Sequence, residues 1–177
     1  NVEELERMAR MIADMLFLAK SDNDLVVPHP EPLDLVAEVG SLFEFYEALA
    51  EERNVALHCS GSGQVAGDRL MLRRAVGNLL SNALCHTPPG GRIVVHVDDS
   101  NATVVKLTVE NSGETIAAEH LPRLFDRFYR ADSSRQRASD GVGLGLAITR
   151  SILRAHGGDA SVRSADGVTA FELVIPA

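Results

Sequence analysis

The chain has 177 residues, of which 45% are hydrophobic and 24% charged, and its formal net charge is −8. A chain of this length and composition can bury one core, which excludes global disorder. The acidic balance excludes a general nucleic-acid binder, because such a protein needs a basic face to displace counterions from phosphates. No apolar run approaches the roughly 20 residues that a membrane-spanning helix requires.

The first predicted element is a helix with an apolar seam. Apolar residues recur at alternating spacings of three and four, which is typical of a coiled coil or a helix bundle. The seam consists of Leu5, Met8, Ile12, Met15 and Ala19. A polar run at 21–24 ends this helix, and three prolines that follow prevent its continuation. We therefore expect a helix over 1–24, a linker over 25–32 and a separate domain over 33–177. Because the helical pattern is already under way at Asn1, we also expect a preceding segment.

Beyond the linker, the hydrophobic pattern alternates between helix and strand. The 3.6-residue period predicts helices over 36–49, 70–84 and 144–155, the second capped by Asp68, and a shorter helix over 117–125. Alternation of apolar and polar residues predicts strands over 55–59 and 64–66, and two hairpins, 93–98 with 104–111 and 160–164 with 169–175. This order of elements predicts an α+β fold of two layers, in which helices cover one face of a mostly antiparallel sheet.

A glycine run, Gly141-Val142-Gly143-Leu144-Gly145-Leu146, opens the last predicted helix. Glycine lets the backbone approach a bound group closely, and the unpaired N–H groups of the first helical turn favour an anion such as phosphate. Asn78 and Asn82 stand one turn apart on an earlier predicted helix, where their amide oxygens can hold a hydrated magnesium ion. Together these features predict a magnesium–nucleotide site.

Basic residues gather between the predicted short helix and the glycine run. They are Arg123, Arg127, Arg130, Arg135 and Arg137. Such a group supplies a local positive field for a polyanion such as a triphosphate, and a solvated arginine-rich loop is the alternative interpretation.

Four motifs in a fixed order resemble those of the catalytic ATP-binding domain of sensor histidine kinases. Residues 72–84, LRRAVGNLLSNAL, resemble the N box, and 109–116, VENSGETI, the first glycine box. Residues 124–130, LFDRFYR, resemble the F box, and 141–146, GVGLGL, the second glycine box. The resemblance implies a Bergerat-type two-layer α/β sandwich with a mixed, mostly antiparallel sheet.

The opening helix extends this resemblance. Residues 11–19, MIADMLFLA, resemble the second helix of the dimerisation and phosphoacceptor domain, so one helix of a dimerisation bundle would precede the catalytic domain. Together with 121–130, LPRLFDRFYR, this helix is most similar to the heavy-metal, copper- or silver-type branch of the family.

The resemblance implies roles at the phosphate end of the site. Asn82 would bridge magnesium to the phosphates with help from Asn78. The alternative is that both asparagines are ordinary polar residues on a solvated helix face. Arg130 would approach the terminal phosphate. Residues 127–140 would form the ATP lid, which Phe128 would anchor in the core. The glycine-run residues expected to hold the phosphates are Gly141, Gly143, Leu144, Gly145 and Leu146.

The adenine end of the site follows from the same resemblance. Asn111 stands where most family members have an aspartate that accepts a hydrogen bond from the adenine amino group, and the amide oxygen of asparagine can still accept it. The other residues expected at the base are His86, Gly113, Ile116 and Thr169, with a plain surface histidine as the alternative for His86.

Two further positions depart from the family pattern. Cys85 replaces the usual lysine or arginine, and Val168 replaces a glycine. Because Cys85 brings no charge, phosphate binding must depend on the helix terminus, magnesium and the arginines.

The activity implied is transfer of the γ-phosphoryl group of ATP, with Mg²⁺, to a histidine on the helix that precedes Asn1. The partners implied are a response regulator, that upstream phosphoacceptor helix and a second kinase subunit in a homodimer, with no nucleic acid and no direct membrane contact. The chain would be the cytoplasmic portion of an inner-membrane sensor kinase. Because the first helix contains no histidine, the fragment alone should not autophosphorylate.

Two alternative functions remain open. In gyrase-type, chaperone-type and mismatch-repair ATPases, a glutamate base occupies the position of Asn78, and an amide cannot take up that proton, which disfavours hydrolysis. A degenerate, non-catalytic interaction module is the other alternative, and it is consistent with Cys85, Asn111 and Val168.

Overall fold

The computed structural model describes residues 1–131 and 143–177. The helices are α1 (Val2–Asp22), α2 (Leu35–Glu52), α3 (Arg69–His86), the 3-10 helix η1 (Leu121–Arg123) and α4 (Gly145–Ala155). The strands are β1 (Glu31–Asp34), β2 (Ala56–Gly61), β3 (Gln64–Gly67), β4 (Arg92–Asp98), β5 (Val104–Ser112), β6 (Asp159–Ala165) and β7 (Val168–Pro176).

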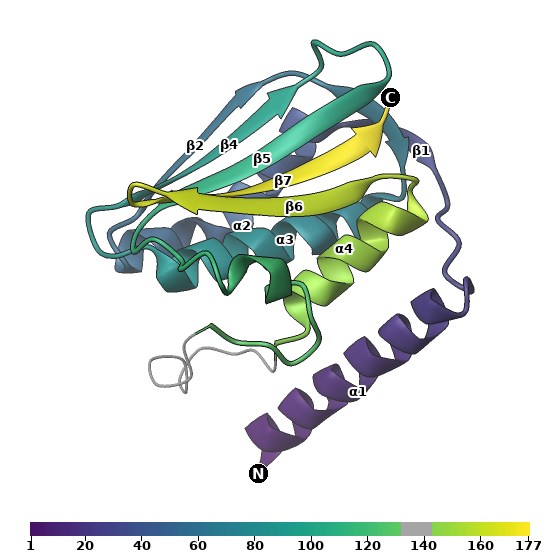
Figure 1. Ribbon diagram of the computed structural model, residues 1–177, viewed down its shortest axis with the longest axis horizontal. Helices are drawn as coiled ribbons and strands as arrows, with labels where there is room; N and C mark the ends of the chain where they lie inside the picture. Colours follow the sequence, from purple (N-terminus) through teal and green to yellow (C-terminus); the bar gives the residue numbers. More distant parts are fainter. Residues whose placement is uncertain (132–142) are drawn as a thin grey trace.

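The main sheet has five strands in the order β2-β4-β5-β7-β6. Strand β2 runs parallel to β4, and the other pairs are antiparallel, so both predicted hairpins form. Helices α2, α3 and α4 cover one face of this sheet (Figure 1). The predicted α+β class, with two layers and a mixed, mostly antiparallel sheet, is confirmed.

The core lies between the sheet and the three covering helices. Alternate residues of β4, namely Ile93, Val95 and Val97, are buried, as the period of a strand with one covered face requires. Helices α3 and α4 pack together, and in one of the polar contacts between them the fully buried Thr149 hydroxyl donates to the Ala75 carbonyl at 3.2 Å. This contact fixes α4, which begins at the glycine run, against the helix that carries the two asparagines.

Strand β1 lies partly inside the predicted linker. Glu31–Asp34 pairs with β3 in a separate two-stranded antiparallel sheet. The sequence did not predict this strand because its four residues are too few for a clear alternation, and Pro32 argues against a strand unless that strand lies at a sheet edge.

The predicted helix over 117–125 is wrong. Only Leu121–Arg123 is helical there, as a single 3-10 turn with turns on either side. Pro122 lies inside the predicted helix and lacks an N–H group, so it interrupts the hydrogen bonds of a continuous α-helix.

Helix α1 lies below α4 in Figure 1 and contacts the domain with one side only. On that side Leu18 is buried, and Arg74 of α3 donates to the Asp14 carboxylate at 2.5 Å and lies over the Phe17 ring at 5.0 Å. Most of the predicted apolar seam is exposed on the other side, including Leu5, Met8, Ile12 and Met15. None of the described helices is long and apolar enough to cross a membrane.

Candidate nucleotide-binding site

Three polar residues form a row across one end of the main sheet. Asn111 on β5 lies opposite Thr169 on β7, which in turn lies opposite Ser164 on β6. Asn111 and Thr169 are both 6% exposed, and the Thr169 and Ser164 hydroxyls are 2.8 Å apart. The structure thus brings two of the predicted adenine residues together. Ser164 was missed by the sequence reasoning, although its position opposite Thr169 in the predicted hairpin was the available signal.

The Asn111 side chain is oriented by its own backbone. Its amide nitrogen donates to the Ser112 carbonyl at 3.2 Å, so the identity of the two amide atoms is fixed by this contact. The amide oxygen accepts no hydrogen bond from the other described residues. An acceptor with no partner at a nearly buried position suits an exocyclic amino group such as that of adenine.

Gly113 lets the end of β5 pass close to the end of α3. A Cβ atom at Gly113 would lie 2.8 Å from the His86 carbonyl oxygen, which is closer than real Cβ contacts. Its N–H donates to the Gly167 carbonyl at 2.9 Å, and the Ile116 N–H donates to the Ser164 hydroxyl at 2.9 Å. The segment after β5 is therefore held against the β6–β7 hairpin, and Ile116 is half-buried there. His86 contributes its backbone to this approach, while its side chain is exposed.

Asn78 joins the N-terminus of α4 to α3. Its amide nitrogen donates to the carbonyl of Gly145, the first residue of α4, at 3.1 Å. Asn82 lies one turn further along α3 and is half-buried, and its side chain has no hydrogen-bond partner among the described residues. The two asparagines therefore differ, since Asn78 holds the start of α4 and Asn82 keeps its amide oxygen available.

The start of α4 leaves its first N–H groups without a side-chain cap. Leu144, at the N-cap position, is buried and has no side-chain group that could accept a hydrogen bond. Unpaired N–H groups and the positive end of the helix dipole favour an anion there. Gly143 and Leu146 flank this terminus, whereas Gly141 lies outside the described residues.

Phe128 does not anchor the predicted lid in the core, so that prediction is wrong. Phe128 is 53% exposed, and its backbone is left-handed, with a φ of +64°. Its N–H donates to the Gly143 carbonyl at 2.9 Å, and a Cβ at Gly143, where φ is +81°, would lie 2.9 Å from the Phe128 Cα. Phe125, which is half-buried, packs against the core instead, edge-to-face on Phe171 with ring centroids 6.1 Å apart.

Two of the clustered arginines are paired with carboxylates. Arg127 donates to Asp22 of α1 at 2.6 Å, and Arg123 lies 3.6 Å from Asp126 and stacks over Tyr129. Arg130 is half-buried at the end of this segment. Arg135, Arg137 and most of the predicted lid, 127–140, lie outside the described residues. The predicted local positive field therefore rests chiefly on Arg130 in the part of the chain that the structure describes.

The side chains at this site suit a magnesium ion only if a bound nucleotide supplies further oxygen ligands. Among the described residues no group of three His, Cys, Asp or Glu side chains could hold a metal ion. The amide oxygen of Asn82 suits a hard cation that keeps several waters and binds phosphates. Cys85, half-buried on the same helix, supplies no positive charge for phosphate.

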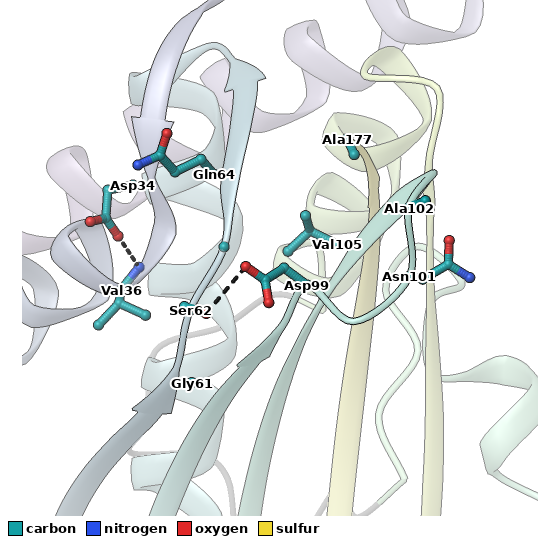
Figure 2. Close-up of a pocket in the computed structure, with 11 residues that line it drawn as sticks. Asp34, Val36, Gly61, Ser62, Gln64, Asp99, Asn101, Ala102, Val105 and Ala177 are labelled. Carbon is teal, nitrogen blue, oxygen red and sulfur yellow. Dashed lines mark hydrogen bonds between the residues drawn. The ribbon is translucent and has the colours of Figure 1, made fainter.

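A cavity lies at the opposite end of the sheet, where β4 ends and β5 begins. It measures about 630 Å³ and opens widely to solvent (Figure 2). Its carboxylates already have partners, because Asp34 accepts from the Val36 N–H at 3.0 Å and Asp99 accepts from the Ser62 hydroxyl at 3.1 Å. None of the predicted site residues lines this cavity.

The comparisons with known proteins agree with this geometry. Residues 67–177 match the family described as histidine kinase-, DNA gyrase B- and HSP90-like ATPase. The chain is 55% identical over 178 residues to sensor histidine kinase CusS of Escherichia coli K12, covering 100% of this chain and 37% of CusS. The chain thus spans little more than a third of the length of that relative.

Solved structures show the same fold. The mycobacterial sensor histidine kinase MprB has a TM-score of 0.71 and 30% identity, covering 84% of this chain and 97% of that one. Histidine kinase ThkA in complex with response regulator protein TrrA has a TM-score of 0.79 and 23% identity, covering 99% of this chain and 48% of that one, and it shows the fold alone. The chain belongs to the histidine kinase-, DNA gyrase B- and HSP90-like ATPase family, and its resemblance to the catalytic domain of sensor histidine kinases of the heavy-metal type is confirmed.

Proposed function

We propose that the domain binds ATP with Mg²⁺ and presents the γ-phosphoryl group to a histidine on a preceding helix of the dimerisation bundle. One observation carries the proposal. Three of the four motifs meet at α3, because the Asn78–Gly145 contact joins the N box to the second glycine box and Gly113 of the first glycine box lies close to the His86 carbonyl at the end of the same helix. Family membership supports nucleotide binding at this place.

The residues divide between the two ends of the nucleotide. At the base, the Asn111 oxygen accepts from the adenine amino group, Thr169 and Ser164 complete the polar row, and Ile116 offers an apolar contact. Gly113 keeps the backbone close enough for this pocket to form. His86 supplies the carbonyl that Gly113 approaches, and its exposed side chain would flank the adenine.

At the phosphate end, the N–H groups at the start of α4 receive the anion, and Arg130 adds a positive charge. Asn82 would hold Mg²⁺, which when bound would neutralise phosphate charge. Asn78 acts through α4, because its amide nitrogen is engaged by the Gly145 carbonyl. An amide cannot take a proton from water, and a neutral imidazole already carries a nucleophilic lone pair, so the arrangement favours transfer to histidine over hydrolysis.

The proposed domain division and partners follow from the same similarity to sensor histidine kinases. Residues 1–24 would be the second helix of the dimerisation and phosphoacceptor domain, 25–32 the linker and 33–177 the catalytic domain, with β1 starting in the last residues of the linker. The exposed seam of α1 would pack against the acceptor helix and a second subunit. The complex of ThkA with TrrA supports a response regulator as partner. We place this chain in the cytoplasmic portion of an inner-membrane sensor.

Two measurements test the proposal. Calorimetry with ATP and ADP, with and without Mg²⁺, should show binding that Asn82→Ala weakens most when Mg²⁺ is present. When the chain is mixed with a polypeptide that supplies the upstream helix, ATP labelled at the γ-phosphate should give acid-labile label on that helix. Absence of nucleotide binding would favour a non-catalytic interaction module. Rapid phosphate release by the chain alone would favour an ATPase.

A further inference from the structure

A compact group of side chains surrounds Tyr129, the residue immediately before Arg130. The Tyr129 hydroxyl is hydrogen-bonded to His120 Nδ1, and its half-buried ring packs against the edge of the core. The Arg123 guanidinium lies over that ring at 4.4 Å, and His120 Nε2 is 3.7 Å from the Glu119 carboxylate. The residues of this group lie outside the strands and the α-helices.

The backbone on either side of Tyr129 is fixed as well. The Tyr129 N–H donates to the Asp126 carbonyl at 3.3 Å, and the Phe128 N–H donates to the Gly143 carbonyl at 2.9 Å. Two residues beyond Gly143, the Gly145 carbonyl accepts from Asn78. A short series of hydrogen bonds and peptide units therefore connects the base of Arg130 to the start of α4 and to the N box.

We propose that Tyr129 and His120 are a positioning pair that fixes the backbone from which Arg130 reaches the terminal phosphate of the nucleotide. The inference rests on the proposed function, because it assumes that Arg130 meets that phosphate. A long arginine side chain loses much rotational freedom when it binds a phosphate, and a fixed starting point reduces that loss. The pair therefore affects the contact that distinguishes ATP from ADP.

The chain allows this role to be separated from plain packing. Tyr129→Phe keeps the ring, the stacked Arg123 and the core contacts, and removes only the hydroxyl bonded to His120. The chain has one other tyrosine, Tyr46, whose hydroxyl donates to the Gly77 carbonyl at 3.3 Å between α2 and α3. Tyr46→Phe deletes the same atom from another half-buried hydrogen bond and is the matched control.

The test measures the dissociation constants of ATP and ADP with Mg²⁺ by calorimetry, together with melting temperatures, for each variant of the whole chain. Loss of one hydrogen bond in the support of Arg130 should weaken ATP binding about three- to tenfold. ADP binding should stay within about twofold, since ADP lacks the phosphate that Arg130 meets. His120→Ala should behave like Tyr129→Phe, and the double variant should be no worse than either one. His120→Gln keeps a hydrogen-bonding group and should restore much of the preference for ATP.

Tyr46→Phe should leave the ratio of the two affinities unchanged. In an Arg130→Ala background, Tyr129→Phe should have no further effect on that ratio. The positioning role is overturned if the chain binds both nucleotides and Tyr129→Phe leaves the ratio as it was. It is overturned equally if the Tyr129 and Tyr46 variants weaken ATP and ADP alike, because that result is one of stability alone. If the unaltered chain binds neither nucleotide, the proposed function itself fails, which is a different result.

Discussion

Replacing Asn111 by aspartate should strengthen nucleotide binding and weaken the fold at the same time. An ionised acceptor makes a stronger hydrogen bond to the adenine amino group than an amide does, by about 1 kcal/mol, which is a factor of about five in affinity. Asn111→Ala removes the acceptor and should weaken binding by a similar factor.

The cost to the fold follows from the contact that orients Asn111. The aspartate cannot donate to the Ser112 carbonyl, so the 3.2 Å hydrogen bond is lost and an anion faces a carbonyl oxygen at a residue that is 6% exposed. The lost bond and the desolvated charge together should lower the free energy of unfolding by about 1–3 kcal/mol. The free energy of unfolding of a native protein is about 5–15 kcal/mol in total, so the variant should still fold.

Calorimetry at pH 8, where the new carboxylate is ionised, measures the affinity, and urea unfolding without nucleotide measures the stability. Saturation at about a hundred times the dissociation constant should restore about 2.7 kcal/mol to either protein. The adenine role of Asn111 is refuted if neither the aspartate nor the alanine variant changes the affinity for ATP.

Gly113→Ala should cost about 1–3 kcal/mol in urea unfolding, because its Cβ would meet the His86 carbonyl oxygen at 2.8 Å, and it should weaken ATP binding. Gly40→Ala, in α2 with nothing within 4 Å of the new Cβ, should instead stabilise by about 0.5–1 kcal/mol. Phe125→Ala should cost about 3 kcal/mol and the exposed Phe128→Ala under about 0.5 kcal/mol, and equal losses would contradict the placement of these two rings. Burial raises the pKa of Asp68, but the N–H groups of His29 and Met71, together with the charges of His156 and His29, lower it by more than burial raises it, so its pKa lies below the ordinary value. Its stabilising contribution is therefore complete above the unfolded pKa of about 3.9 and is lost as the pH falls through the lower folded value, so the advantage over Asp68→Asn, about 1 kcal/mol at pH 7, should shrink below about pH 4.

Most of the fold could be predicted because its elements bury one face with a regular period. The alternation in β4 and β5 gave the hairpin, and Asp68 caps α3 through the Met71 N–H, as expected from its position before an apolar helical pattern. The parallel pairing of β2 with β4 was not predicted, because two strands separated by a helix carry no local signal of their relative direction.

The sequence identified most residues of the candidate site but not the orientations of their side chains. Motif spacing identified Asn78, yet only tertiary packing shows that its amide nitrogen is engaged by Gly145. Phe128 was expected in the core from the resemblance to the F box, whereas its backbone is left-handed and bonded to Gly143, which is distant in sequence. Side-chain direction at such positions is a property of the folded chain, and hydrophobicity alone cannot predict it.

The placement of the positive charges narrows how a triphosphate can be held. Arg127 is paired with Asp22 of α1, Arg123 with Asp126, and Arg74, one turn before Asn78, with Asp14. An arginine held by a carboxylate carries little net field toward a third group, so these side chains do little to replace the cation missing at Cys85. Within the described residues, the proposed phosphate contact therefore depends on Arg130 and on the N–H groups at the start of α4. These N–H groups are positioned by backbone geometry. The contact of Asn78 with the Gly145 carbonyl therefore matters to phosphate binding, although neither residue is charged.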